Sequence, residues 1–179
     1  MVTTDNTKKI ARLAMLTALS VVLVAAFHFP IFPAAPYLEY DPADIPVLLA
    51  GLMYGPVAGI AVAACASVIQ GLTVSAASGV TGIVMHFLAT GSLVLVSSLI
   101  AKKSGGRKTL LGLALGSLTM VAVMCGWNLV FTPMFTGMPV SEVAKMLVPV
   151  IIPFNAIKAG VNSLLAYIVY RAIAAYTAG

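Results

Sequence analysis

Charged residues are scarce in this 179-residue chain, at 8% of the sequence, whereas hydrophobic residues make up 61% of it. In a soluble domain about a quarter of all residues are charged, because charged side chains cover its surface. Disordered chains are also rich in charge and poor in large apolar residues. The composition therefore excludes a free-standing soluble enzyme and a disordered chain, and it indicates a protein embedded in a lipid bilayer.

Carboxylates are missing from the 97 residues between Asp44 and Glu142. Proton relays, Na⁺-coupling sites and metal-dependent phosphotransfer sites in membranes depend on acidic groups inside the helix bundle. We therefore expect neither an ion-coupled pump nor a membrane enzyme. If the protein moves a solute uphill, the energy has to come from another subunit.

Clusters of metal-binding or paired thiol residues are also missing. Cys65 and Cys125 lie far apart in apolar segments without a CxxC motif, and His28 and His86 have no second ligand nearby in the sequence. These patterns predict no disulfide, no metal site and no bound cofactor.

The net charge of +5 comes from short cationic clusters between apolar stretches. A nucleic-acid binder needs a dense basic patch instead, so we expect no nucleic-acid partner.

Six apolar runs predict an all-α integral membrane protein that forms a single membrane domain over residues 1–179. The runs cover residues 10–29, 44–54, 56–74, 79–101, 109–135 and 148–176. Because a transmembrane helix uses about 20 residues, six spans leave no room for a separate soluble domain. The second run is too short to cross a hydrocarbon core of about 30 Å alone, so we expect it to be tilted or set among the other helices.

The positions of the cations favour six spans over five. If residues 44–74 formed one span, the cationic cluster after the fourth run would lie outside the cell. Two spans that turn back at Gly55-Pro56 place eight of the ten cations in the cytoplasm, in agreement with the positive-inside rule. We therefore predict a six-transmembrane-helix bundle with both termini cytoplasmic. The eight cations are Lys8, Lys9, Arg12, Lys102, Lys103, Arg107, Lys108 and Arg171.

One cation, Lys158, falls inside a predicted span. Asn155, Lys158 and Asn162 are spaced at i, i+3 and i+7, so they share one face of a helix. No acid lies nearby in the sequence to neutralise this lysine, and an intramembrane charge is a candidate functional residue by default. The alternative is a lysine that snorkels or pairs with backbone carbonyls. We favour a binding site on this face.

A second polar group is expected at the same depth. Asn128 lies near the predicted outer end of the fifth run, and the outer loop before the second run carries several prolines and the aromatic residues Tyr37 and Tyr40. Amides and an ammonium group below such a loop suit a flat heteroaromatic ligand with several carbonyls and ring nitrogens. The alternative is that Asn128 makes a helix–helix hydrogen bond and that the aromatic residues belong to an interfacial belt.

The first apolar run carries a stripe of alanines on one face: Ala11, Ala14, Ala18 and Ala25. Small residues at this spacing allow another helix to approach closely. The stripe therefore predicts either packing inside the bundle or docking of a helix from another protein, and the spacing alone does not favour one of the two.

Several segments together resemble the substrate-binding S components of energy-coupling factor (ECF) vitamin transporters. The AxxxA pair Ala14/Ala18 and Tyr54-Gly55-Pro56 are similar to elements shared across S components. The segments 40–46, 128–139 and 153–158 resemble the riboflavin-specific members. The resemblance implies a six-helix bundle in a prokaryotic cell membrane that captures riboflavin at its outer face. It also implies a transmembrane T component and two ATPase subunits as partners, which use the ATP.

The resemblance also assigns roles to individual residues, none of them catalytic. Asn128, Asn155 and Lys158 match residues that contact the isoalloxazine ring, Pro36, Leu38 and Tyr40 match a lid formed by the first loop, and Ala14 and Ala18 match the surface that couples to the T component. We add Asn162 to the ligand-binding set from its helical spacing. Two alternatives stay open, namely an S component for another vitamin or heteroaromatic micronutrient, and a passive channel or structural membrane bundle.

Overall fold

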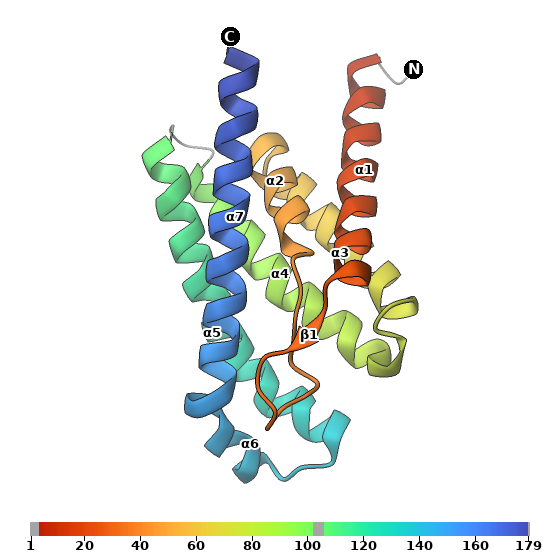
Figure 1. Ribbon diagram of the computed structural model, residues 1–179, viewed down its shortest axis with the longest axis vertical. Coiled ribbons are helices and arrows are strands. Elements are labelled where there is room, and N and C mark those ends of the chain that lie inside the picture. The colour runs from red at the N-terminus through yellow and green to blue at the C-terminus, as the bar shows by residue number, and fades with distance from the viewer. Residues whose placement is uncertain (1–3, 102–105, 179) are drawn as a thin grey trace.

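The computed structural model describes residues 4–101 and 106–178, and almost all of this part of the chain is helical (Figure 1). Lys102 and Lys103, two of the cations used to orient the chain, lie outside the described residues. Both chain ends lie at the same end of the bundle, at the top of Figure 1. The helices are α1 (Thr4–Ala26), α2 (Asp44–Tyr54), α3 (Pro56–Leu72), α4 (Gly79–Ala101), α5 (Gly106–Thr136), α6 (Val140–Met146) and α7 (Ile152–Ala178).

The helical membrane class expected from the composition is confirmed. Among the described residues, four helical segments are long and apolar enough to cross a bilayer: α1, α4, α5 and the continuous segment from α6 through α7. The two other apolar helices, α2 and α3, are shorter, with 11 and 17 residues. The number of spans and the cytoplasmic orientation of the termini stay predictions.

A sharp turn at Gly55-Pro56 separates α2 from α3. Gly55 has a φ of +94°, a conformation that glycine adopts without steric cost. Pro56 occupies the first turn of α3, where its missing N–H is not needed. The two helices fold back on each other so closely that a Cβ added to Gly59 would collide with the backbone of Gly51. The predicted break in this apolar stretch is therefore present.

The α4–α5 pair forms the most extensive helix contact of the bundle. Gly112 and Gly116 of α5 face the backbone of α4, and a Cβ added at either position would collide with the carbonyl oxygen of Ser97 or Leu93. The absence of side chains at these two positions lets the helix backbones approach each other directly.

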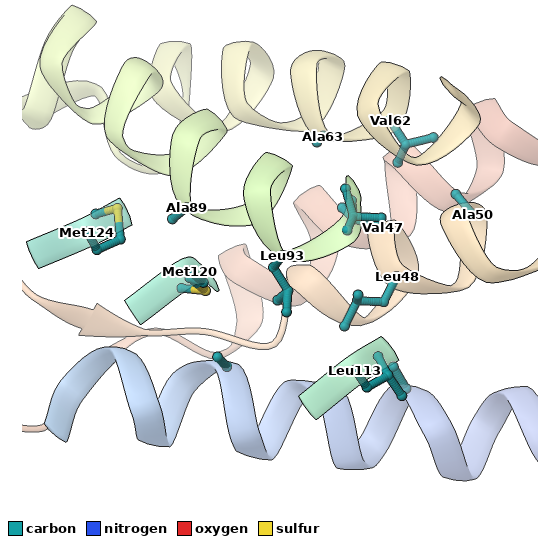
Figure 2. Close-up of a cluster of buried hydrophobic side chains, with 13 residues drawn as sticks. Val47, Leu48, Ala50, Val62, Ala63, Ala89, Leu93, Leu113, Met120 and Met124 are labelled. Carbon is teal, nitrogen blue, oxygen red and sulfur yellow. The ribbon is translucent and has the colours of Figure 1, made fainter. Parts of the chain in front are cut away.

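A buried apolar cluster joins helices α2, α3, α4, α5 and α7 (Figure 2). Leu48, Leu93 and Leu113 are among its largest fully buried side chains. At one end the cluster finishes with the methionines Met120 and Met124 of α5. These flexible, apolar side chains also line the cavity described below, so the core forms the floor of that cavity.

The segment between α1 and α2 crosses the end of the bundle that lies opposite the chain ends (Figure 1). Its two short strands, β1 (Phe29–Pro30) and β2 (Glu39–Tyr40), pair in antiparallel fashion, with Phe29 opposite Tyr40. Between them, Ala35 and Leu38 are buried in a second apolar cluster with Val143 of α6 and Phe154 of α7. We call residues 27–43 the first loop, and this packing holds it against α6 and α7.

The last apolar run differs from the single span predicted over residues 148–176. Here α6 leads through a π-helical turn, η2 (Leu147–Ile151), into α7. Pro149 lies inside this turn and has no backbone N–H to donate, so the regular hydrogen-bond pattern of an α-helix is interrupted there. The helix that carries Asn155, Lys158 and Asn162 therefore begins at Ile152.

The alanine stripe of α1 lies on the surface of the protein. Ala11, Ala14, Ala18 and Ala25 are all exposed, whereas Ser20 and Val24 on another face of α1 are buried. Of the two interpretations of the stripe, packing inside this bundle is therefore wrong for the described residues. The stripe faces lipid or a partner.

Candidate functional site

A cavity of about 160 Å³ lies below the first loop, at the end of the bundle opposite the chain ends. Helices α3, α4, α5 and α7 supply its walls, and the first loop covers it. The side chains around it are mostly apolar, with polar groups at particular places, which is the usual composition of a small-molecule site. Its apolar residues are Val24, Leu38, Met85, Ala89, Met120, Met124, Phe131, Phe135 and Phe154.

Three of the residues predicted to bind ligand line this cavity together. Asn128 comes from α5, and Asn155 and Lys158 come from α7; their exposed fractions are 0%, 2% and 7%. Each amide is oriented by its own helix, because Asn128 Nδ2 donates to the Met124 carbonyl and Asn155 Nδ2 donates to the Ile151 carbonyl, both at 2.8 Å. Fixed amides of this kind form a preorganised polar wall.

Lys158 has a buried partner that lies far away in the sequence. Its Nζ donates to Asp41 Oδ2 of the first loop at 2.6 Å, so the positive charge is neutralised across 117 positions of the chain. Burial raises the pKa of the Asp41 carboxyl, but the Lys158 ammonium, His86 and the hydrogen bonds from Lys158 and the Ala43 N–H together lower it by more, and the pKa lies below its usual value. The ion pair is therefore present at neutral pH and is lost only in acid, as the pH falls through that lowered pKa.

Asn162 does not line the cavity. Its Nδ2 donates to the Asp41 carbonyl oxygen and to Asp44 Oδ2, both at 2.9 Å, and its Oδ1 accepts a hydrogen bond from the Tyr40 hydroxyl at 3.0 Å. Tyr40 is also absent from the cavity lining. The two residues instead fasten the end of the first loop to α7, directly beside the ion pair.

Asp44 continues this polar network into α3 and α4. Thr90 donates to Asp44 Oδ1 at 2.5 Å, and His86 Nε2 lies 4.0 Å from the same oxygen. On its other side, His86 Nδ1 shares a hydrogen bond of 2.8 Å with Ser67. Asp44, Thr90 and Ser67 are almost completely buried and the His86 side chain is 11% exposed, which makes each unpaired group in this network costly.

The remaining predicted loop residues divide into two groups. Leu38 is buried and lines the cavity, whereas Pro36 is exposed and does not line it. The neighbouring Tyr37 does line it, and its ring packs edge-on against Phe135 of α5, with 6.4 Å between ring centroids. The part of the first loop that covers the cavity is therefore Tyr37 to Asp41.

Asp41, Asp44 and His86 were not predicted from the sequence as members of this region. Two of them gave a signal that could have been used, since Asp41 and Asp44 lie where the outer loop enters the second apolar run. His86 gave no signal, because an isolated histidine in an apolar helix has no distinctive spacing.

Comparisons with known proteins place this chain in one family. Residues 8–170 match the family model of the ECF transporter, substrate-specific component. The riboflavin transporter FmnP of Bacillus subtilis is 35% identical over 161 residues, and the match covers 84% of each protein. The riboflavin transporter RibU of Staphylococcus aureus is 34% identical over 178 residues, covering 95% of this chain and 92% of that protein.

A solved structure gives the same result. The S component of a bacterial ECF transporter superposes with a TM-score of 0.82 at 34% sequence identity, over 96% of this chain and 98% of the other. The family model, the sequence relatives and the solved fold all extend over nearly the whole chain, so this chain belongs to the family of substrate-specific components of ECF transporters.

Proposed function

We propose that this chain is the riboflavin-binding subunit of an ECF-type importer in a prokaryotic cell membrane. The observation that carries the proposal is the wall formed by Asn128, Asn155 and Lys158 inside a mostly apolar cavity. The similarity to riboflavin transporters of two bacteria supports the choice of ligand. No step of this function is chemical, so the protein is not an enzyme.

The chemistry of this wall matches one edge of the flavin ring. The pyrimidine part of isoalloxazine presents two carbonyl oxygens, ring nitrogens and one N–H. Asparagine side chains both donate and accept hydrogen bonds, and a lysine donates. The rest of the ring is flat and apolar, and it suits the aromatic side chains Phe131, Phe135 and Phe154 on the cavity wall. We assign ring recognition to the amides and Lys158, and assign closure above the ring to Leu38 and its neighbours.

The proposed topology places this cavity at the outer face. An even number of spans places both termini on the same side of the membrane. The six proposed spans are α1, α2, α3, α4, α5 and the α6–α7 segment. The shared position of the two chain ends, opposite the cavity, supports this arrangement (Figure 1). With the termini cytoplasmic, as the positive-inside rule predicts, the cavity opens toward the exterior.

The source of energy lies outside this chain. We infer a transmembrane T component and two ATPase subunits as partners, in line with the family to which the chain belongs. The exposed alanine stripe on α1 supports docking of another helix there, because small side chains permit close approach in a membrane. Ala14 and Ala18 are the residues we place at this contact.

Titration of the purified protein with riboflavin tests the proposal. Protein isolated in detergent from riboflavin-containing cells should be yellow, and ligand-free protein should quench flavin fluorescence until one equivalent is bound. Biotin and thiamine serve as controls and should neither bind nor compete. A colourless preparation that does not quench riboflavin would contradict the ligand assignment, and saturable binding of a control vitamin would assign the cavity to that vitamin.

A further inference from the structure

Unpaired polar atoms gather around the cavity. Within the described residues, four buried side-chain nitrogen or oxygen atoms have no hydrogen-bond partner: Tyr37 Oη, Gln70 Oε1, His86 Nε2 and Ser97 Oγ. The first three belong to residues that line the cavity, and Ser97 does not. Buried polar groups in proteins nearly always have a partner, so groups without one next to a cavity indicate water or a ligand.

One half of the Gln70 amide is unsatisfied. Gln70 lies in the last turn of α3 with an exposed fraction of 7%, and its Nε2 makes only a long contact of 3.5 Å with Ser75 Oγ. Exchanging the amide nitrogen and oxygen would pair the oxygen with Ser75 and leave the nitrogen free instead. In either orientation, one half of the amide has no partner within the protein.

His86 of α4 is in the same situation. Its Nδ1 is paired with Ser67, whereas its Nε2 lies 4.0 Å from Asp44 Oδ1, which is beyond hydrogen-bonding distance. That carboxylate oxygen already accepts the hydroxyl of Thr90. If Nδ1 carries the proton, Nε2 is a free acceptor, and if Nε2 carries it, it is a free donor. Both tautomers leave Nε2 without a partner among the described residues.

Gln70 and His86 come from other helices than the amide wall. They belong to α3 and α4, near the connection through the short helix η1 (Ala76–Ser78), whereas Asn128, Asn155 and Lys158 belong to α5 and α7. In Figure 1 the α3–α4 connection lies to the right of the first loop, whereas α6, which leads from α5 to α7, lies below the loop. The hydroxyl-bearing residues Ser75, Ser78 and Thr81 also line the α3–α4 side.

The charges on the cavity surface restrict what this side can bind. Among the described residues that line the cavity, Lys158 is the one lysine or arginine, and it belongs to α7 and is paired with Asp41. A phosphate or carboxylate group would therefore meet no dedicated cation beside Gln70 and His86. Neutral hydroxyl groups fit better, because a hydroxyl both donates and accepts. It can satisfy either orientation of the Gln70 amide and either tautomer of His86.

We propose that Gln70 and His86 form a second subsite that binds the hydroxyl groups of the ligand's polyol side chain, while α5 and α7 hold its ring. This inference rests on the proposed function, because it takes riboflavin as a ligand with a flat ring and a hydroxylated chain. The subsite confers specificity for the chain, independently of recognition of the ring.

Comparison of two flavins isolates the subsite. Lumiflavin has the same ring as riboflavin but a methyl group in place of the polyol chain. Two variants test the subsite. Gln70→Leu replaces the amide with an apolar side chain of similar size. His86→Asn keeps a polar atom near the position of Nδ1, which pairs with Ser67, and has no atom at the position of Nε2. Ser97→Ala is the matched control, because it removes the buried unpaired hydroxyl that does not line the cavity. Affinities for both flavins are measured by fluorescence quenching.

We expect each subsite variant to weaken riboflavin binding about tenfold, the size of one hydrogen bond to a buried group. Lumiflavin affinity should stay within about twofold of wild type, and this binding also reports that the variant is folded. Ser97→Ala should change neither affinity. Unchanged riboflavin binding in both variants would overturn the subsite and assign the unpaired atoms to water. An equal loss of affinity for riboflavin and lumiflavin in the variants would also overturn the subsite. Equal affinity of the wild-type protein for the two flavins would overturn it as well. Wild-type protein that binds neither flavin would contradict the proposed function itself.

Discussion

Asp41 of the first loop and Lys158 of α7 form a buried ion pair with 2.6 Å between Oδ2 and Nζ. Both residues also line the cavity, so one contact connects the segment that covers the site with a residue proposed to bind the ligand. The Lys158 ammonium lies 3.5 Å from the Glu39 carbonyl oxygen as well. The position of the loop and the orientation of Lys158 are therefore interdependent.

The first prediction concerns the charge balance of this pair. Lys158→Met leaves the Asp41 carboxylate buried without its partner, and such a loss costs about 3–5 kcal/mol of stability. We expect a lower Tm in detergent together with weaker riboflavin binding. The double variant Asp41→Asn/Lys158→Met removes both charges, so it should regain most of the Tm but not the affinity. Thermal unfolding of the two variants measures the Tm, and flavin titration measures their affinity for riboflavin.

The two readouts separate stability from binding in these variants. A double variant as unstable as Lys158→Met would show that the charge balance is not the cause of the instability. Riboflavin binding at wild-type affinity in the double variant would remove Lys158 from the proposed site.

The second prediction concerns Asn162, which holds the first loop without lining the cavity. Asn162→Ala removes its hydrogen bonds to the Asp41 carbonyl and the Asp44 carboxylate. We expect riboflavin affinity to fall about tenfold, mostly through faster dissociation, because most affinity changes at an otherwise intact site appear in the off-rate. Stopped-flow fluorescence measures both rates.

Asn128→Ala is the comparison for this experiment, because Asn128 lines the cavity directly. It should weaken binding without a change in the mobility of the first loop. Equal protease sensitivity of the loop in Asn162→Ala and wild-type protein would argue against the role of Asn162 as a fastener.

The sequence predicted features that depend on local patterns. The apolar runs, the turn at Gly55-Pro56 and the common face of Asn155 and Lys158 all follow from composition and helical spacing, and the helices are present. The pairing of Lys158 with Asp41 could not be obtained in this way, because it depends on how the first loop folds back over α7. The helical spacing of Asn162 also placed it on the right face but did not show that it turns toward Asp44 rather than into the cavity.

The third prediction tests the close contact of α4 and α5. Gly116→Ala places a Cβ against the Leu93 carbonyl and the Ser97 side chain, so we expect a loss of about 1–3 kcal/mol from overpacking. Gly126 of the same helix has open space around its Cα. Gly126→Ala should therefore leave the Tm unchanged or raise it slightly, since alanine favours helix. Thermal unfolding in detergent distinguishes the pair, and equal Tm values would contradict the close contact.

The fourth prediction tests the alanine stripe as a docking surface. Ala14→Trp and Ala18→Trp place a bulky side chain on the exposed stripe, far along α1 from the first loop. Because the cavity is not altered, we expect riboflavin binding by the purified subunit to stay within about twofold of wild type. Uptake by cells that also express the proposed T component and ATPases should be lost, since tryptophan prevents the close helix contact that small residues allow.

Leu19→Trp is the matched control for the stripe. Leu19 is 46% exposed on α1 but lies about 140° around the helix from Ala14 and about 100° from Ala18. A tryptophan there adds the same bulk to the lipid-facing surface, and we expect normal uptake. Loss of uptake in all three variants would indicate a general effect of bulk on α1. Normal uptake in both stripe variants would show that the alanines face lipid and that the partner docks elsewhere on the bundle.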